Sequence, residues 1–185
     1  MAYGYHGKIL RVNLSTGAIS TDEHDYNWYR RYVGGLGVLT YYLLKEVPRG
    51  IDAFDPENRF VVAPGPLTGV PFAGSARNAV GCKSAITGGW SKCEAGGWFG
   101  AELKRAGWDG IVVVGRAEKP AYIWIDDDQV EIRDAGHLWG KSTKEALEGI
   151  WEEHGDERIR AMLIGPGAEK LVRFSCIIND LRHAG

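Results

Sequence analysis

A glycine-rich stretch in the middle of the chain carries the residues whose types and spacing best suit chemistry. Gly96 and Gly97 come directly before a predicted helix, where backbone N–H groups can meet an anion and a flat ligand can approach closely. Upstream, Arg77 has a planar guanidinium that suits a phosphate or a heteroaromatic ring. These residues predict a site for a large, flat, phosphorylated cofactor. A cluster of glycine-rich turns without any ligand explains them about equally well.

A second pattern, at 135–142, nearly matches a phosphate-binding P-loop between a predicted strand and a predicted helix. In that interpretation Lys141 is the counter-charge of a nucleotide phosphate. However, alanine replaces the first glycine of the motif, and two bulky residues stand where the loop must wrap the phosphate. We favour the alternative, an ordinary helix start in which Ser142 and Glu145 form a capping box.

The side chains that could act as nucleophiles or metal ligands form no recognisable set. The three cysteines, Cys82, Cys93 and Cys176, fit no metal-binding spacing, and the five histidines are scattered. Cys93 is more simply a structural cysteine than a nucleophile, because only Lys92 beside it would lower its pKa. The acidic run 126–128 is better explained as a hairpin turn than as a metal site.

Composition limits the class of protein. The chain has 185 residues, of which 44% are hydrophobic and 25% are charged, so it can fill a core. The formal net charge of −2 provides no basic surface for nucleic acid. We find no signal peptide and no apolar run that could span a membrane, and the few cysteines indicate a reducing, cytoplasmic setting. The 26 glycines are about 14% of the chain, twice the usual share of about 7%, and call for a local explanation.

The predicted elements occur in the same order twice, about 100 residues apart. Each set has a hairpin, helical sequence, a strand and a Gly/Pro turn, which suggests an internal duplication. Because hairpins dominate and helices are few, we expect an α+β fold rather than a doubly wound sheet. The first set covers strands 9–14, 18–23 and 60–63 and helical segments between 26 and 47, and the second covers strands 121–125, 129–133 and 161–164 and helix 142–154. A short helix at 99–106 and a buried strand at 111–114 lie between the sets.

Four stretches then resemble one known family, the tungsten-containing aldehyde ferredoxin oxidoreductases, in its N-terminal domain. They run in family order over essentially the whole chain, 1–185, and lie at 7–17, 63–69, 96–104 and 164–169. The resemblance implies an α+β platform of two β-sheets that carries a cofactor made of tungsten or molybdenum, two pterins and a bridging magnesium. It also implies oxidation of aldehydes to carboxylic acids, with electrons passing through a [4Fe–4S] cluster to ferredoxin. In such proteins the pterins hold the metal, which agrees with the lack of side-chain ligands.

The resemblance assigns cofactor-binding roles residue by residue. Arg77 matches an arginine that contacts pterin, and Gly96 matches a glycine that lies close to it. Glu94 stands where the family has an asparagine whose backbone carbonyl helps hold magnesium, and Ala95 lies between them in this strip. The replacement leaves the carbonyl role open but puts any side-chain contact in doubt.

A second cofactor strip is implied at 179–185. Ala184 falls at its magnesium-contacting carbonyl. The cofactor-binding arginine of the family aligns with His183, while Arg182 is one position away, so either residue is a candidate. The resemblance implies no catalytic residue within this chain.

Family members continue into two helical domains that carry the cluster cysteines and the substrate channel. We therefore expect this chain to be a fragment that needs those domains and is inactive alone. The alternative is a stand-alone pterin-binding or assembly module without redox activity. An isolated platform would expose apolar surface and could form homo-oligomers; the candidates for that surface are Trp90, Trp98, Ile177 and Ile178.

Overall fold

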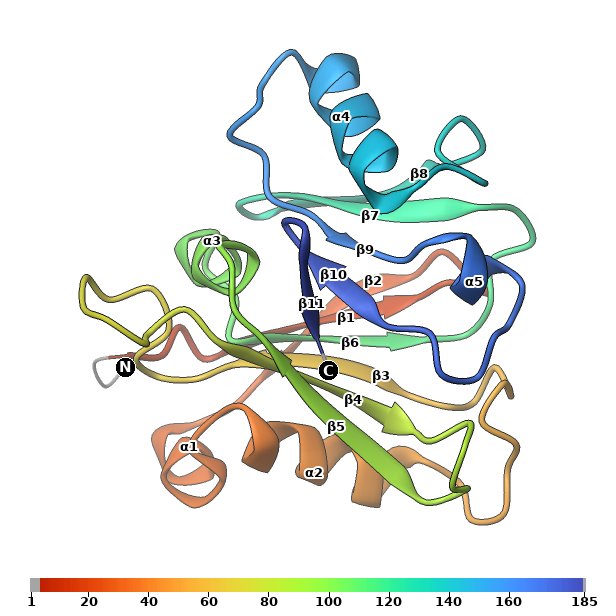
Figure 1. Cartoon of the computed structure of the whole chain (residues 1–185). Coiled ribbons are helices and arrows are strands. Elements are labelled where there is room, and N and C mark those ends of the chain that lie inside the picture. Colours follow the sequence, from red (N-terminus) through yellow and green to blue (C-terminus); the bar gives the residue numbers. More distant parts are fainter. Residues whose placement is uncertain (1–3, 185) are drawn as a thin grey trace.

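The computed structural model describes residues 4–184 and contains a six-stranded sheet with a smaller layer of strands and a helix above it (Figure 1). The strand order of the large sheet is β2-β1-β6-β3-β4-β5. Its strands are β1 (Lys8–Asn13), β2 (Ile19–Glu23), β3 (Phe60–Pro64), β4 (Asn78–Lys83), β5 (Trp90–Ala95) and β6 (Gly110–Val114), and its helices are α1 (Tyr26–Tyr32), α2 (Leu36–Glu46) and α3 (Phe99–Arg105).

The second part of the chain forms two smaller ladders, β7-β8 and β11-β10-β9. Helix α4 covers this part at the outer end of the molecule (Figure 1). Its elements are β7 (Ala121–Asp126), β8 (Gln129–Asp134), α4 (Thr143–His154), β9 (Met162–Leu163), α5 (Pro166–Glu169), β10 (Ile177–Asn179) and β11 (Arg182–Ala184). The expected α+β class is confirmed, and the second sheet is divided into two ladders.

Both faces of the six-stranded sheet are buried, because successive side chains of a strand point to opposite faces and each face packs against another layer. Ile9 of β1 faces α2 and packs with Val38 and Leu39, whereas Leu10 and Val12 face the second layer. All three β1 side chains are fully buried. A third core lies between α4 and the strands of the second part, around Leu147 and Ile150. The sheet therefore joins two hydrophobic cores, and a third stabilises the duplicated part.

Most predicted elements are confirmed, but the hairpins β4–β5 and β10–β11 were not predicted. β4 contains a glycine and ends in polar residues, and β5 carries Ser91, Lys92 and Glu94 because it is the edge strand of its sheet. The hairpin β10–β11 has only short strands, joined by Asp180 and Leu181. Neither segment has the apolar alternation that identifies a strand in the sequence.

Gly37 has a packing role that predicts a large effect of substitution. A Cβ at this position would lie 1.9 Å from the carbonyl oxygen of Tyr32, which is backbone and cannot rotate away. We expect Gly37→Ala to lower the free energy of unfolding by about 2 kcal/mol, measured by urea denaturation. The control is Gly149→Ala in α4, whose Cβ would meet only the ends of two flexible side chains, Leu138 at 3.1 Å and Lys141 at 3.8 Å. Equal stability of the two variants would contradict this role of Gly37.

Within residues 4–184, no helix is long and apolar enough to cross a membrane.

Candidate functional site

The first strip of predicted site residues lies where β4 begins and β5 ends. Asn78 and Ala95 are paired across the two strands, so Arg77 and Gly96 lie side by side just outside the ladder. The backbone of Arg77 is fixed, because its carbonyl accepts a hydrogen bond of 2.8 Å from the Thr68 hydroxyl. The Arg77 side chain is exposed. The strip thus combines a rigid backbone with an accessible guanidinium.

The two glycines after β5 differ in their surroundings. A Cβ on Gly96 would meet nothing within 4 Å, so its backbone borders open space. Gly97 has a φ of +93°, and a Cβ there would lie 3.1 Å from an Asp180 carboxylate oxygen. Gly97 is therefore required by backbone conformation. Gly96 instead leaves an open face beside Arg77 that a flat group can approach.

Two polar residues hold the second strip against the first: Asn179, which is buried, and Asp180, which is half-buried. The Asn179 side-chain amide donates to the Asn78 side-chain oxygen at 2.8 Å and to the Gly96 carbonyl at 3.3 Å. The Asp180 carboxylate accepts from the backbone N–H groups of Trp98 at 2.7 Å and Phe99 at 3.0 Å. These bonds join the end of β10 to the start of α3, and β11 lies against β5 (Figure 1).

The tight turn of the β10–β11 hairpin places the second strip. Asp180 and Leu181 have φ values of 46° and 65°, as a two-residue turn of the primed type requires. Arg182, which is exposed, begins β11, and His183 and Ala184 complete it. The backbone of both residues is described, but their side chains lie outside the described part of the chain. The structure thus brings the two predicted strips, 77 with 94–96 and 182–184, to one side of the molecule.

The register determines which carbonyl groups face outward from these strands. In an antiparallel ladder, every second residue of a strand bonds to its partner strand, and the bond from Ser84 N to Gly89 O shows which residues of β5 do so. Ala95 is one of those that bond to β4. Glu94, one position earlier, therefore directs its backbone carbonyl away from β4. In β11, Arg182 closes the hairpin with Asn179, so the His183 carbonyl faces outward and that of Ala184 faces β10. By register, the counterpart of Glu94 in the second strip is His183.

The first strip carries an ion pair between Lys92 and Glu94, and buried amide groups lie beside it. Lys92 lies 2.6 Å from the Glu94 carboxylate and lowers the pKa of that group, so Glu94 is ionised at neutral pH. Among the residues that the structure describes, the Nδ2 of Asn78 and the Oδ1 of Asn179 are buried and have no hydrogen-bond partner. Leaving such groups unpaired is costly, so both could bond to a group that binds at the strip.

The other chemistry suggested by the sequence has no structural basis. Burial raises the pKa of the thiols of Cys82 and Cys93, which disfavours a nucleophilic thiolate. Among residues 4–184, no group of three or more His, Cys, Asp or Glu residues could hold a metal ion.

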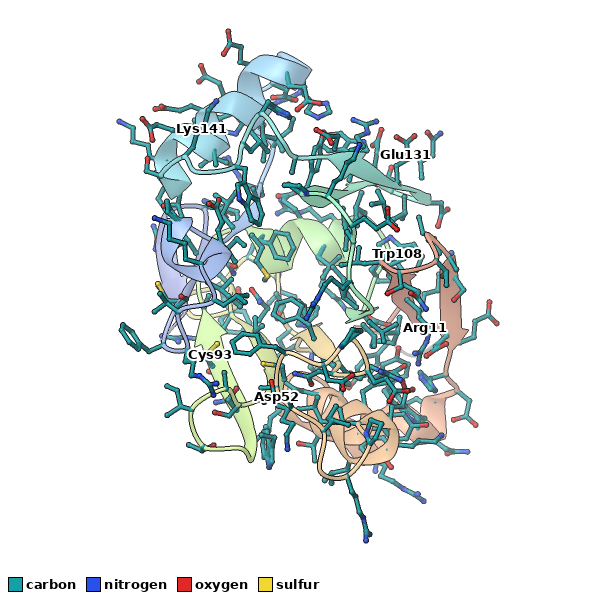
Figure 2. All side chains as sticks on the ribbon, turned by 90° about the vertical axis from the view of Figure 1, so that its right-hand side faces the viewer. Arg11, Asp52, Cys93, Trp108, Glu131 and Lys141 are labelled. Atoms are coloured by element: carbon teal, nitrogen blue, oxygen red, sulfur yellow. The ribbon has the colours of Figure 1, made fainter. Side chains whose placement is uncertain are left out.

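The P-loop interpretation is also disfavoured by the structure. The backbone N–H of Gly140, which would have to bind phosphate, donates to both Glu169 carboxylate oxygens at 3.0 and 2.9 Å. Ser142 and Glu145 form the expected capping box at the start of α4. Figure 2 shows Lys141 beside this helix, well separated from Cys93 on β5.

Comparison with known proteins decides the family. The model of the aldehyde ferredoxin oxidoreductase N-terminal domain matches residues 9–185. The chain belongs to this family. It is 47% identical over 98% of its length to the tungsten-containing aldehyde ferredoxin oxidoreductases of Pyrococcus furiosus and Thermococcus kodakarensis, and spans 30% of the length of each.

Other similar proteins carry different names. The chain is 34% identical to the WOR-like subunit of an aliphatic sulfonate oxidoreductase from Pyrococcus furiosus, covering 98% of this chain and 31% of that protein. A solved structure, the BamBC active-site complex of benzoyl coenzyme A reductase with 1,5-dienoyl-CoA, superimposes with a TM-score of 0.96 at 35% identity. That match covers 100% of this chain and 28% of the other. The fold of this aldehyde ferredoxin oxidoreductase N-terminal domain is therefore shared by proteins named for different substrates.

Of the four apolar residues expected to form an exposed surface, only two are exposed. Trp90 and Trp98 are about half exposed, at 48% and 54%, whereas Ile177 and Ile178 are partly buried between strands. Ile177 packs against the core between the layers, and Ile178 against the core around α4. The two tryptophans thus remain as candidate contact residues of this family domain, and homo-oligomer formation stays a prediction.

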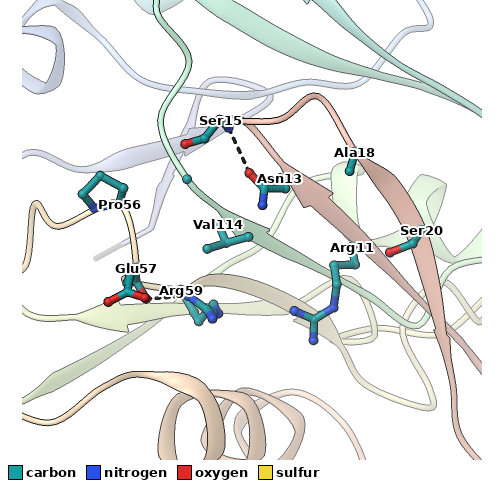
Figure 3. Close-up of a pocket in the computed structure, with 10 residues that line it drawn as sticks. Arg11, Asn13, Ser15, Ala18, Ser20, Pro56, Glu57, Arg59 and Val114 are labelled. Carbon is teal, nitrogen blue, oxygen red and sulfur yellow. Dashed lines mark hydrogen bonds between the residues drawn. The ribbon is translucent and has the colours of Figure 1, made fainter.

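A separate pocket of about 480 Å³ is lined by Arg11 and Arg59 among other residues (Figure 3). Both arginines are already paired. Arg11 lies 2.6 Å from Glu46 and 2.8 Å from Asp22, and Arg59 lies 3.1 Å from Glu46. Because these carboxylates neutralise the guanidinium groups, the pocket does not offer a free anion site.

This ion network predicts a loss of stability in acid. Burial would raise the pKa of Glu46, but hydrogen bonds from Arg11 and Arg59 outweigh it and lower that pKa. A carboxyl group whose pKa is lower in the folded state stabilises the fold at neutral pH, and this contribution is lost as pH falls through the folded pKa. We expect the melting temperature to fall less steeply between about pH 5 and pH 3 in Glu46→Gln than in the original chain. Identical profiles of melting temperature against pH for Glu46→Gln and the original chain would contradict the prediction. The control is Glu148→Gln, at an exposed position of α4.

Proposed function

We propose that this chain is the cofactor-binding platform of a tungsten or molybdenum bis-pterin oxidoreductase that oxidises aldehydes to carboxylic acids. The observation that carries the proposal is the open backbone face of Gly96 beside the exposed Arg77, with β11 lying against the same edge. The 47% identity to tungsten-containing aldehyde ferredoxin oxidoreductases supports the aldehyde class over the substrates named for the more distant relatives.

The residues present fit such a cofactor. A pterin is flat and carries amide-like donors and acceptors. The strip offers an open glycine backbone, together with the Asn78 Nδ2 and Asn179 Oδ1 atoms, which have no partner in the described part of the chain. A phosphate needs a cation, and Arg77 is exposed beside the strip. The ionised Glu94 carboxylate would repel a phosphate unless a cation such as magnesium lies between them.

In this proposal, the protein binds and orients the cofactor rather than reacting itself. Arg77 would hold one pterin, together with the backbone of Ala95 and Gly96. Arg182 or His183 would hold the other pterin, and the Glu94 carbonyl and a carbonyl of β11 would hold the magnesium. The resemblance assigns the latter role to Ala184, whereas the register favours His183, because its carbonyl faces outward. When bound, the cofactor supplies the two-electron redox chemistry.

The remaining parts of the activity belong to polypeptide outside this chain. We assign the [4Fe–4S] cluster, the substrate channel and the docking of ferredoxin to the helical domains of a longer protein, since the chain spans about 30% of its relatives. A cytoplasmic location is part of the same proposal, and the unpaired cysteines support it.

The test is to replace Arg77 in a longer protein that carries this domain and purifies with its cofactor. We expect Arg77→Ala to reduce tungsten, measured by mass spectrometry, and pterin, measured by fluorescence after oxidation, at least about tenfold, because the phosphate loses its cation. Arg49→Ala, another exposed arginine away from the strips, should retain both. Unchanged tungsten and pterin content in Arg77→Ala would refute its role.

A second measurement separates the proposal from the stand-alone module. Residues 1–185 alone should not reduce a viologen dye with an aldehyde. Redox activity of this chain alone would overturn the fragment hypothesis, and stable pterin binding without activity would favour the pterin-binding or assembly module.

A further inference from the structure

Two of the three cysteines lie on the face of the large sheet that packs against the second layer. In β4, a Cβ on Gly81 would lie 2.5 Å from the Leu39 side chain of α2, so Gly81 faces α2. Cys82, the next residue of the strand, therefore faces the second layer. In β5, Cys93 lies opposite Val80, and both pack in the core between the layers. Cys82 and Cys93 thus share one face of the β4–β5 hairpin.

The segment that carries the third cysteine runs along the same hairpin. Two hydrogen bonds of 2.8 Å fix its ends: the Arg173 guanidinium donates to the Ala85 carbonyl, and the Asn179 amide donates to the Asn78 side-chain oxygen. Residues 173–179 therefore follow β4 in the opposite direction, from 85 to 78. Cys176 is the middle residue of this segment, so it lies beside the middle of the stretch 78–85, where the other two cysteines are.

The electrostatics of the thiols agree with this placement. Burial raises the pKa of the Cys93 thiol, and the charges of Cys82 and Cys176 raise it further, while Lys92 opposes them. Such an effect requires a short separation, because charge–charge interactions weaken with distance and with intervening solvent. The Cys82 thiol responds instead to burial and to the Ser91 hydroxyl, which lies 3.8 Å away. Cys176 is therefore a closer neighbour of Cys93 than of Cys82.

The geometry of the hairpin decides which two thiols can be joined. Cys82 lies opposite Ser91, so Cys93 is its diagonal neighbour. Diagonal neighbours have Cα atoms about 7–8 Å apart, whereas a disulfide needs them within about 6.8 Å. Cys176 is exposed and precedes Ile177, the first residue of β10, so the ladder does not fix its side chain. The pair that can approach is Cys93 with Cys176.

We infer that Cys93 and Cys176 are a redox-sensitive thiol pair, which a low-molecular-weight disulfide such as glutathione disulfide converts into an intramolecular disulfide. The exposed Cys176, as thiolate, attacks one sulfur of glutathione disulfide, so that a mixed disulfide forms and one glutathione thiolate leaves. Cys93, after losing its proton to solvent, attacks the Cys176 sulfur and displaces the second glutathione. Two protein thiols are oxidised, and one glutathione disulfide is reduced to two thiols.

A bridge between these cysteines would join the two strips of the candidate site. Cys93 directly precedes Glu94 in the edge strand β5, and Cys176 lies in the segment that leads through β10 to Arg182. Disulfides in reducing compartments are usually transient and redox-sensing. Oxidation would therefore hold the strips at one spacing, and reduction would release them.

Peptide mapping tests this pair directly. The reduced 185-residue chain is incubated with glutathione disulfide, its free thiols are blocked with iodoacetamide, and the tryptic peptides are analysed by mass spectrometry without reduction. Trypsin places the three cysteines in separate peptides, 78–83, 93–104 and 174–182. We expect the linked peptides 93–104 and 174–182 to be at least about tenfold more abundant than any bridge containing Cys82, because proximity gives Cys93 the higher effective concentration. Dithiothreitol should restore all three thiols.

Serine variants provide a matched control and a second readout. Cys82→Ser keeps the pair and should form the same bridge, whereas Cys93→Ser should stop at one glutathione on Cys176. The oxidised original chain should unfold at a higher urea concentration than the reduced chain, because the bridge closes a long loop, and this difference should vanish in Cys93→Ser. A bridge that contains Cys82, a mixed disulfide as the final product of the original chain, or a disulfide between two copies would overturn the pairing.

Discussion

Replacing Asp109 by alanine should destabilise the domain by about 4 kcal/mol, because the substitution leaves the buried Lys104 ammonium group without its counter-charge. Asp109 is 3% exposed, and its carboxylate lies 2.6 Å from the Lys104 ammonium group. It also accepts from the backbone N–H groups of Gly7 at 2.7 Å and His6 at 2.8 Å. The variant therefore loses one ion pair and two hydrogen bonds at the junction of the N-terminal segment with α3.

Urea denaturation of the 185-residue chain measures this effect. Asp156→Ala is the control, because the Asp156 carboxylate bonds only to nearby Arg158 in an exposed turn, and its stability should be close to the original. The double variant Lys104→Met/Asp109→Leu removes both charges and should recover part of the loss, because the backbone N–H groups of His6 and Gly7 still lack their acceptor. A double variant as unstable as Asp109→Ala would show that the uncompensated charge is not the cause.

Replacing Asp180 by alanine should cost about 3 kcal/mol and also loosen the candidate site. One carboxylate oxygen accepts from Trp98 N and Phe99 N, and the other accepts from Ala161 N at 3.1 Å. A single side chain therefore joins the start of α3, the segment before β9 and the β10–β11 turn. Without it, the two strips of the site lose a shared anchor.

Two measurements check this prediction. Urea denaturation gives the change in stability, and amide exchange should show faster exchange at Trp98 and Phe99 than in the original chain. Asp128→Ala is the matched control, since Asp128 is an exposed residue in the β7–β8 turn. If Asp180→Ala exchanged no faster at Trp98 and Phe99 than Asp128→Ala, the anchoring role would be wrong.

The elements predicted correctly are those whose signals are local. The hairpin strands around residues 9–23 and 121–133 alternate between apolar and polar residues, and the Ser142 capping box is a four-residue pattern. Such signals depend on neighbours in the chain, so they can be recognised without the fold. The edge hairpin β4–β5 was missed because its polar residues and glycine suit an exposed edge rather than a regular alternation.

The sequence by itself determined the family, through four short motifs in family order, and it indicated the duplicated order of elements and the positions of the two strips. The glycine surplus also gained a partial explanation in the sequence, since many glycines lie between 65 and 100.

Only the tertiary structure decided which residues meet. Asn78 and Asn179 are 101 positions apart, yet their side chains share a hydrogen bond of 2.8 Å, and Asp180 reaches the start of α3 across 82 positions. Pairing of distant segments depends on register and on burial shared between layers, and neither is encoded in a local pattern.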